Sequence, residues 1–283
     1  MTKSRNCLAT ILFYALVMMA GLVACRKKEP TYEFDLIIGN GNVLDGSGEL
    51  WFPADVAIKS DQIVQVGRLE EKEKRARRVI DAKGLMVSPG FIDIHSHSDY
   101  SLLVDGTAQS KIRQGVTTEV LGEGNSAGPI QGKAQRDLGE YNLQANWKTL
   151  GEYFNRLQTS GISVNVASYV GASQVRSCVL GDESRDPTSE EMERMRELVR
   201  EAMRDGAFGL SSSLIVPPDT YLNTQQLIEL ASVVKPFGGI YSTHIRGEGQ
   251  EIREAIQEAI TIGEKAQVPV DIIHLKIADK RMW

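Results

Sequence analysis

The sequence contains little cysteine and has no excess of basic residues. Only three of its 283 residues are cysteines, and 32 Lys and Arg face 37 Asp and Glu, so the formal net charge is −5. Cys7 and Cys25 lie close to the amino terminus, which leaves Cys178 alone and excludes a disulfide framework in the rest of the chain. Nucleic-acid binders carry clustered positive charge, so we expect no nucleic-acid partner. Stability must come from a hydrophobic core, for which 42% apolar residues suffice.

Residues 1–24 have the pattern of a bacterial export signal. Lys3 and Arg5 give a positive start, and an uncharged, largely apolar run from 7 to 24 follows, which is short for a membrane span. The run ends in LVAC (22–25), which resembles a lipobox, the signal of bacterial lipoproteins. The resemblance implies cleavage before Cys25 and lipid on its thiol.

On this interpretation, residues 25–31 form a polar tether whose basic residues touch anionic lipid head groups weakly. Arg26 stands where an Asp would mark retention in the inner membrane of enteric bacteria. We therefore expect a lipid-anchored protein of the bacterial cell envelope, at the outer membrane and facing the periplasm. An ordinary signal peptide and an uncleaved anchor remain as alternatives.

Residues 32–84 show short apolar segments separated by turn sequences. GNGN (39–42) and DGSG (45–48) are typical turns, and 56–58 with 62–67 predict a hairpin across 59–61. We interpret this region as the amino-terminal part of a small β-sandwich domain.

From residue 85 the pattern changes to strands alternating with helices. The predicted strands are 90–97, 117–123, 163–170, 207–214, 239–244 and 270–275. The clearest helix spans 188–205, where Thr188 and Glu191 form a capping box and a stripe of Met and other apolar residues faces the core. Further helices are predicted at 224–234 and about 250–265.

Such alternation predicts an α/β fold with a parallel sheet covered by helices. A (β/α)8 barrel has eight strand–helix steps in about 250 residues, and six are recognisable here. We therefore expect a partial TIM-type barrel at 85–283, preceded by the small β-sandwich segment. We also expect the chain to be truncated before the last two steps.

All four histidines fall at the carboxyl ends of predicted strands. His95 and His97 end the first, His244 the fifth and His274 the sixth. Residues i and i+2 of a strand share a face, and barrel active sites are built at this end of the strands. One such histidine alone is more often a core residue, but four together predict a metal centre.

The chain resembles the amidohydrolase superfamily and, within it, the N-acyl-D-amino-acid deacylases (D-aminoacylases). PGFIDIHSH (89–97) matches the first-strand motif of the superfamily, and GVTT (115–118) is similar to the start of its second strand. The more specific matches to the deacylase group are GAFGLSSSLIVPP (206–218), THIR (243–246) and IHLK (273–276). The similarity extends from about residue 32 to the end, and such proteins are considerably longer.

The resemblance implies one or two zinc ions, bound by His95, His97, His244 and His274. Many relatives bridge two metals with a carboxylated Lys on strand four, but LSSS (210–213) contains none. D-aminoacylases instead place a Cys at the end of strand two, where this chain has GEGN (122–125).

Glu123 lies beside the position of that Cys, and its carboxylate is able to bridge two cations. We predict Glu123 as the oxygen ligand. Glu119, four residues earlier, is the rival, and a third interpretation has Glu123 only orienting a histidine.

Lys276 shares a strand face with His274 and matches a family residue associated with the carboxylate of the substrate; a solvated lysine is the alternative. Ala172 stands where a related segment has a histidine, which leaves the specificity open. The family's general acid/base is an Asp on strand eight, expected beyond Trp283. Asp93 is expected only to brace the ligands.

The implied reaction is hydrolysis of N-acyl-D-amino acids to a D-amino acid and a carboxylate. Metal-bound water would attack the amide, and the leaving amine needs a proton donor. One alternative is another amidohydrolase acting on cyclic amides, of the dihydroorotase or hydantoinase kind, which the missing Lys on strand four disfavours. The other is a non-catalytic, metal-binding lipoprotein.

We predict that the 283-residue chain expressed alone is inactive or poorly folded, because two barrel steps and the catalytic Asp would be missing. Amide hydrolysis by the purified chain is the measurement, and robust turnover would contradict the prediction.

Overall fold

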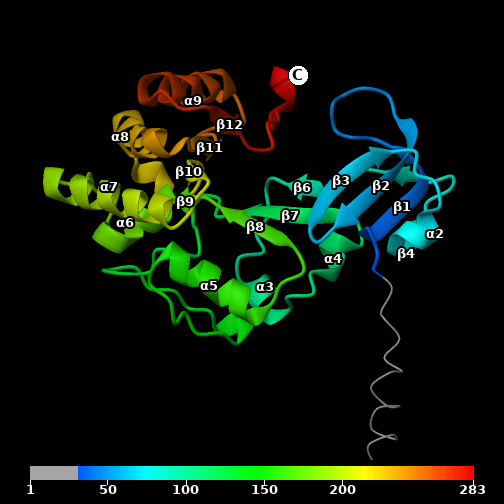
Figure 1. Ribbon diagram of the computed structural model, residues 1–283. Coiled ribbons are helices and arrows are strands. Elements are labelled where there is room, and N and C mark those ends of the chain that lie inside the picture. Colours follow the sequence, from blue (N-terminus) through cyan, green and yellow to red (C-terminus); the bar gives the residue numbers. More distant parts are fainter. Residues whose placement is uncertain (1–30) are drawn as a thin grey trace, which may run out of the picture. The chain divides into compact units, whose positions relative to one another are not determined.

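The computed structural model describes residues 31–283 (Figure 1). The chain divides into two compact units, Met1–Pro89 and Gly90–Trp283. The predicted export signal, the lipidation site Cys25 and nearly all of the tether lie outside the described residues. Within residues 31–283, none of the helices combines the length and apolar character that a membrane crossing requires.

The first unit is a mixed sheet, apart from the short helix α2 (Lys72–Arg75). Its strands run in the order β3-β2-β1-β4, with β5 also paired to β1. They are β1 (Phe34–Val43), β2 (Phe52–Lys59), β3 (Gln62–Gly67), β4 (Ala76–Asp81) and β5 (Met86–Val87). The predicted hairpin is confirmed, because β2 and β3 are antiparallel and Lys59 lies opposite Gln62.

The second unit contains two ladders in which all neighbouring strands are parallel. The first ladder is β6 (Phe91–Asp93), β7 (Val116–Leu121) and β8 (Asn165–Ser168). The second is β9 (Val170–Gly171), β10 (Gly209–Ser213), β11 (Ile240–His244) and β12 (Val270–Ile272). Only Tyr169 separates β8 from β9, and its N–H donates to Leu121 O, so this one segment joins the two ladders.

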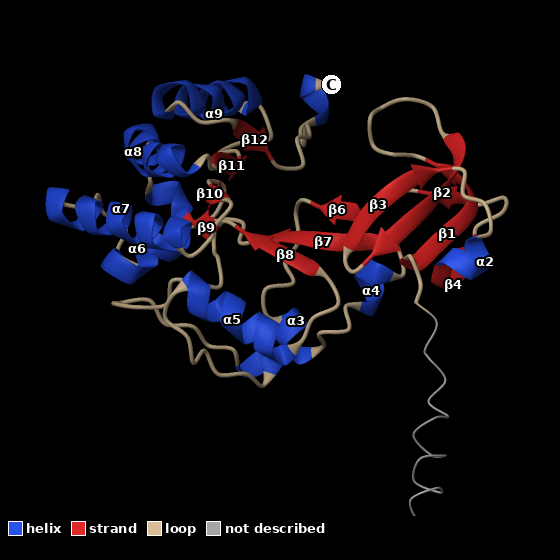
Figure 2. Ribbon diagram, in the orientation of Figure 1, coloured by secondary structure: helices blue, strands red, loops and turns tan. Residues whose placement is uncertain are grey.

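Helices connect these strands and cover them on one side (Figure 2). They are α3 (Ser101–Val104), α4 (Gln109–Ile112), α5 (Leu150–Ser160), α6 (Ala172–Leu180), α7 (Ser189–Arg204), α8 (Thr224–Val234) and α9 (Ile252–Ala266). Short 3-10 helices are η1 (Gly139–Tyr141), η2 (Asp219–Tyr221), η3 (Lys235–Phe237) and η4 (Lys280–Met282). Helix α8 packs on β10 and β11, and α9 packs on β12.

The main core of this unit lies between the helices and the strands. Leu121, Tyr153, Leu210 and Tyr241 are all 1% exposed or less. The predicted helix at 188–205 is confirmed as α7: Thr188 caps it in a capping box with Glu191, and its methionines are buried in the core. Burial of apolar surface on this scale is the main stabilising contribution to the fold.

The strands that lead to the predicted site are shorter than the sequence indicates. Those predicted at 90–97, 117–123 and 270–275 end at Asp93, Leu121 and Ile272. The prediction that one strand carries both His95 and His97 is therefore wrong, because they follow β6 in a loop. The loops still start at the carboxyl edge of the parallel strands, so the residues reach the same place.

Candidate metal centre

Four histidines and one glutamate meet at the carboxyl edge of the parallel strands. His95 and His97 follow β6, Glu123 follows β7, His244 ends β11 and His274 follows β12. They form two groups of three, His95–His97–Glu123 and Glu123–His244–His274, and the donor atoms of each group lie within 4.8 Å of one another. The structure thus brings together the five residues that the sequence predicts as ligands, and Glu123 belongs to both groups.

The Glu123 carboxylate lies between the two histidine pairs. Its Oε2 contacts His95 Nε2 and lies 3.2 Å from His97 Nε2, while its Oε1 lies 3.6 Å from His244 Nδ1. The side chain is only 8% exposed. An ionised carboxylate accepts at both oxygens, so this placement suits a ligand that reaches two cations. The interpretation in which Glu123 only orients one histidine does not account for contacts with three.

The spacing of the imidazoles fits a tetrahedral cation. The Nε2 atoms of His95 and His97 are 3.1 Å apart, and the rings of His244 and His274 have centroids 4.4 Å apart. Two nitrogens that are each about 2.0–2.1 Å from a tetrahedral zinc ion lie about 3.3 Å from one another. The first pair is therefore spaced as two ligands of one ion would be.

His244 presents a nitrogen that nothing satisfies. Its Nε2 is buried and makes no hydrogen bond within the described part of the chain, although Glu248 Oε1 lies 3.3 Å away at an unsuitable angle. Burial, followed by the proximity of His274, lowers the pKa of His244, which favours the neutral form of the ring. Neutral imidazole is the form that binds metals. The donor set of four imidazoles and one carboxylate therefore fits zinc.

Glu119 lies outside the cluster of potential ligands and contacts the loop of the first two histidines. It lies on β7, is 0% exposed, and its Oε2 accepts hydrogen bonds from the hydroxyls of Ser96 and Ser98. Ser96 stands between His95 and His97 in the loop after β6. Glu119 thus anchors the loop that carries these histidines, and it belongs to neither group of potential ligands.

Asp93 supports the same loop from the end of β6. Its Oδ1 accepts the backbone N–H of His95 at 3.2 Å, and its Oδ2 accepts from Lys111 Nζ at 2.5 Å. Burial is the largest single effect and opposes the charge, but the hydrogen bonds from Lys111 and the His95 backbone, together with the charge of Lys111, hold the pKa of Asp93 below its ordinary value. Asp93 is therefore an ionised brace, which is the role that the sequence suggests.

A second carboxylate, Glu248, which the sequence does not predict, lies in the loop between β11 and α9. Its Oε1 contacts Lys276 Nζ and lies 3.4 Å from His274 Nδ1. Lys276 Nζ itself lies 3.1 Å from His274 Nδ1, so the predicted substrate-binding lysine reaches the cluster. The signal that points to Glu248 is its position four residues after His244 in the same predicted loop.

His274 has a left-handed backbone, with a φ of 39°. A residue other than glycine rarely adopts this conformation, and it is enriched where the surrounding structure imposes a functional geometry. Here it turns the chain sharply after β12, so that His274 faces His244 and Lys276 rather than continuing the strand.

Asp219, in η2, is a buried carboxyl group behind the Glu123 turn that sequence reasoning also misses. It is 1% exposed, and its Oδ2 accepts the backbone N–H of Ser213 at 2.5 Å. Burial raises the pKa of Asp219 to about 7, despite the nearby guanidinium groups of Arg176 and Arg246.

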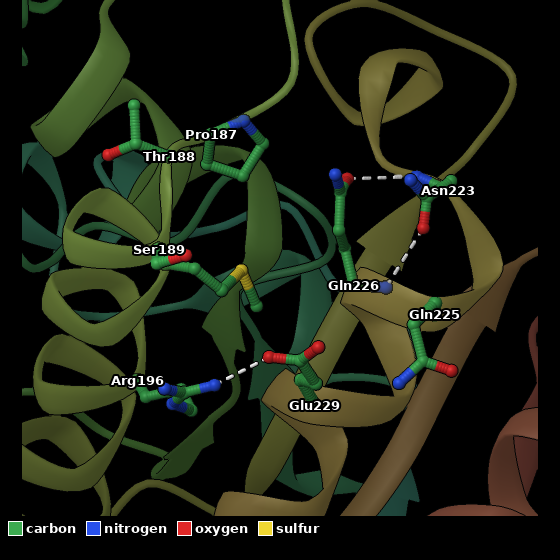
Figure 3. A pocket seen from close by; sticks show the side chains of 9 residues that line it. Pro187, Thr188, Ser189, Arg196, Asn223, Gln225, Gln226 and Glu229 are labelled. Atoms are coloured by element: carbon green, nitrogen blue, oxygen red, sulfur yellow. Dashed lines mark hydrogen bonds and ion pairs between the residues drawn. The ribbon is translucent and has the colours of Figure 1, made fainter.

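The pocket drawn in Figure 3 lies elsewhere, between the amino-terminal ends of α7 and α8. It has a volume of about 360 Å³. Four of its polar side chains are already paired, Arg196 with Glu229 and Asn223 with Gln226 (Figure 3). Since none of its lining residues is a histidine, we do not assign it to the site.

Comparison with known proteins agrees with this arrangement. D-aminoacylase from Alcaligenes xylosoxydans xylosoxydans is 38% identical over 248 residues, which are 86% of this chain and 51% of that protein. N-acyl-D-aspartate deacylase from the same organism is 34% identical and is aligned over 87% of this chain and 50% of its own. The chain therefore spans about half the length of these curated relatives.

Solved structures give the same result. A crystal structure of D-aminoacylase, described as defining a novel subset of amidohydrolases, matches with a TM-score of 0.78 and 36% identity over 84% of this chain and 51% of that one. N-acyl-D-glutamate deacylase from Bordetella bronchiseptica, solved with zinc and a phosphonate inhibitor, gives a TM-score of 0.78 at 29% identity over 84% of this chain and 50% of that one. L-hydantoinase from Arthrobacter aurescens shares the fold, with a TM-score of 0.54 at 17% identity over 84% of this chain and 52% of that one.

The family assignment follows from these matches and from the length of the chain that the family's sequence model covers. The model of the amidohydrolase family matches residues 78–282, which include every residue of the metal-centre cluster. This α/β chain belongs to the amidohydrolase family.

Proposed function

We propose that the intact protein is a zinc-dependent amidohydrolase that cleaves N-acyl-D-amino acids into a D-amino acid and a carboxylate. The observation that carries the proposal is the Glu123 carboxylate shared between two histidine pairs. The relatives named above support the substrate class, since two of them are deacylases of N-acyl-D-amino acids. Another solved D-aminoacylase is described by its binuclear metal centre.

The proposal includes the finer architecture. We infer that β6–β12 and their helices make up six of the eight steps of a TIM-type (β/α)8 barrel. The parallel order of both ladders and their junction at Tyr169 support this inference. We also infer that β1–β5 belong to a small β-sandwich.

The ligands would be His95, His97, Glu123, His244 and His274, holding one or two zinc ions. A bound ion would polarise the amide carbonyl and lower the pKa of a water molecule. The protein groups do the positioning: Asp93 and Glu119 hold the loop of the first two histidines, and Glu248 holds Lys276 beside the last two. Protonation of the leaving amine needs a general acid, a role that we assign to none of the residues described above.

Lys276 would bind the carboxylate of the substrate. An N-acyl amino acid carries this carboxylate one carbon away from the amide that is cleaved. The Lys276 side chain is 52% exposed, yet its ammonium lies 3.1 Å from His274. It therefore offers a positive charge at the open side of the ligand cluster, where it would hold the scissile amide close to the metal.

The first prediction concerns zinc. The intact protein should bind it, and Glu123→Gln should weaken the binding roughly tenfold or more, because the amide that replaces the carboxylate has one oxygen and no charge. Zinc is measured by elemental analysis and by titration against a chelator. Glu119→Gln is the matched control, since it keeps an oxygen acceptor for Ser96 and Ser98. A wild-type protein without zinc, or a larger loss in Glu119→Gln, would contradict the assignment.

The second prediction concerns the substrate. The intact protein should hydrolyse N-acetyl-D-amino acids faster than their L-enantiomers, and Lys276→Met should raise KM about tenfold, as expected for one lost charge-assisted contact. An N-acetyl-D-amino acid amide lacks the carboxylate and should not show this KM effect. Lys265→Met, an exposed lysine on α9, is the control. Turnover of cyclic imides only would sink the deacylase proposal.

From the sequence alone we also propose a lipid anchor on Cys25 that holds the protein at the cell envelope. Labelled palmitate should be incorporated into the wild type and not into Cys25→Ser, and the label should sediment with membranes. Equal labelling of the two proteins would refute the anchor.

A further inference from the structure

The turn that carries Glu123, residues 122–124, is closely packed against neighbouring strands on both sides. The flanking residues Gly122 and Gly124 have left-handed backbones, with φ of 85° and 59°. A Cβ on Gly122 would come within 2.5 Å of Tyr169 O, and one on Gly124 within 2.8 Å of Ser213 Cβ. The turn is thus pressed against β8–β9 on one side and β10 on the other.

One hydroxyl group bridges the two ends of this turn. Ser211 Oγ donates to Gly122 O at 2.5 Å and accepts the N–H of Gly124 at 2.9 Å. Ser211 lies on β10 and is 0% exposed, so water does not compete for either hydrogen bond. A serine hydroxyl has one proton to give and lone pairs to accept with, and here both capacities are used on the two neighbours of Glu123.

A second serine, Ser173, also contacts the turn, but it bonds Gly124 alone. The backbone N–H of Ser173 donates to Gly124 O at 3.1 Å, and its hydroxyl also donates to this oxygen. In the described structure, Ser211 is thus the side chain that ties both flanks of Glu123 together.

The carboxylate needs this support because it has to reach in two directions. Its Oε2 serves His95 and His97 while its Oε1 lies on the side of His244. A small rotation of the turn would keep one group of three and break the other.

We propose that Ser211 is a positioning residue, whose buried hydroxyl clamps the 122–124 turn and so aims Glu123 at both histidine pairs. This inference rests on the proposed zinc site and deepens it. Ser211 touches none of the predicted ligands in the described contacts, so its influence on metal binding passes through the backbone on either side of Glu123.

The test compares Ser211→Ala with Ser212→Ala in the intact protein. Ser212 is the next residue of β10, is equally buried, and bonds Tyr241 and Thr243 instead of the turn. Hydrogen–deuterium exchange of the peptide that covers the turn is measured without metal, and zinc affinity is measured by chelator titration. If Ser211→Ala does not fold, Ser211→Cys replaces it, because a thiol is only a weak donor and acceptor.

We expect faster exchange at the turn and a 10–100-fold loss of zinc affinity in Ser211→Ala, and neither change in Ser212→Ala. In a Glu123→Gln background, Ser211→Ala should cause no further loss of affinity, because the effect acts through that carboxylate.

Unchanged exchange in Ser211→Ala would overturn the clamp, and faster exchange with unchanged affinity would overturn the positioning role. A wild type that binds no zinc would overturn the positioning role together with the proposed function. Zinc binding without hydrolysis of acyl amino acids would overturn the proposed function alone, and the comparison of the serine variants would still decide the clamp.

Discussion

The buried carboxylate of Glu123 is the interaction on which the rest of the site depends. A nearly inaccessible charge is costly unless cations or donors surround it, and here the surrounding groups are imidazoles. Imidazole nitrogens and a carboxylate are both donor groups that zinc accepts as ligands. The cluster is therefore arranged for a cation, which both kinds of donor would share. Glu123 belongs to both groups of potential ligands, so it links histidines from the beginning of the second unit's sequence with histidines from its end.

Around this centre, support comes from the strands and not from the ligands themselves. Asp93, Glu119 and Ser211 each lie in a strand and use a side chain to hold a loop that carries a ligand. Loops alone would leave donor atoms free to move by more than a metal tolerates. The parallel strands limit this movement, because polar side chains near their carboxyl ends form hydrogen bonds with the loops. Glu119 and Ser211 are both 0% exposed, so these hydrogen bonds are protected from water.

The residues of the cluster and the main elements could be predicted from the sequence, because each has a local signature. Thr188 and Glu191 mark the start of α7, and the histidines stand out because the chain has only four. Glu248, Ser211 and Asp219 could not be predicted in the same way. Each becomes meaningful only through a partner far away in the sequence, such as Lys276 for Glu248 or Gly124 for Ser211. The strand ends also differ from the prediction, because Ile94 after β6 and Ile273 after β12 keep an apolar pattern after the ladder pairing has stopped, while β7 ends just before the left-handed Gly122.

The separation of the ligands along the chain has a consequence for how the protein folds. His95 comes from just after the first strand of the second unit and His274 from just after its last. Contacts between such distant segments form late, since each demands that a long loop be closed first. The intervening strands β7 to β11 lie between these two histidines in the sequence. A cation that binds only the assembled cluster would therefore stabilise the finished fold and leave earlier intermediates unaffected.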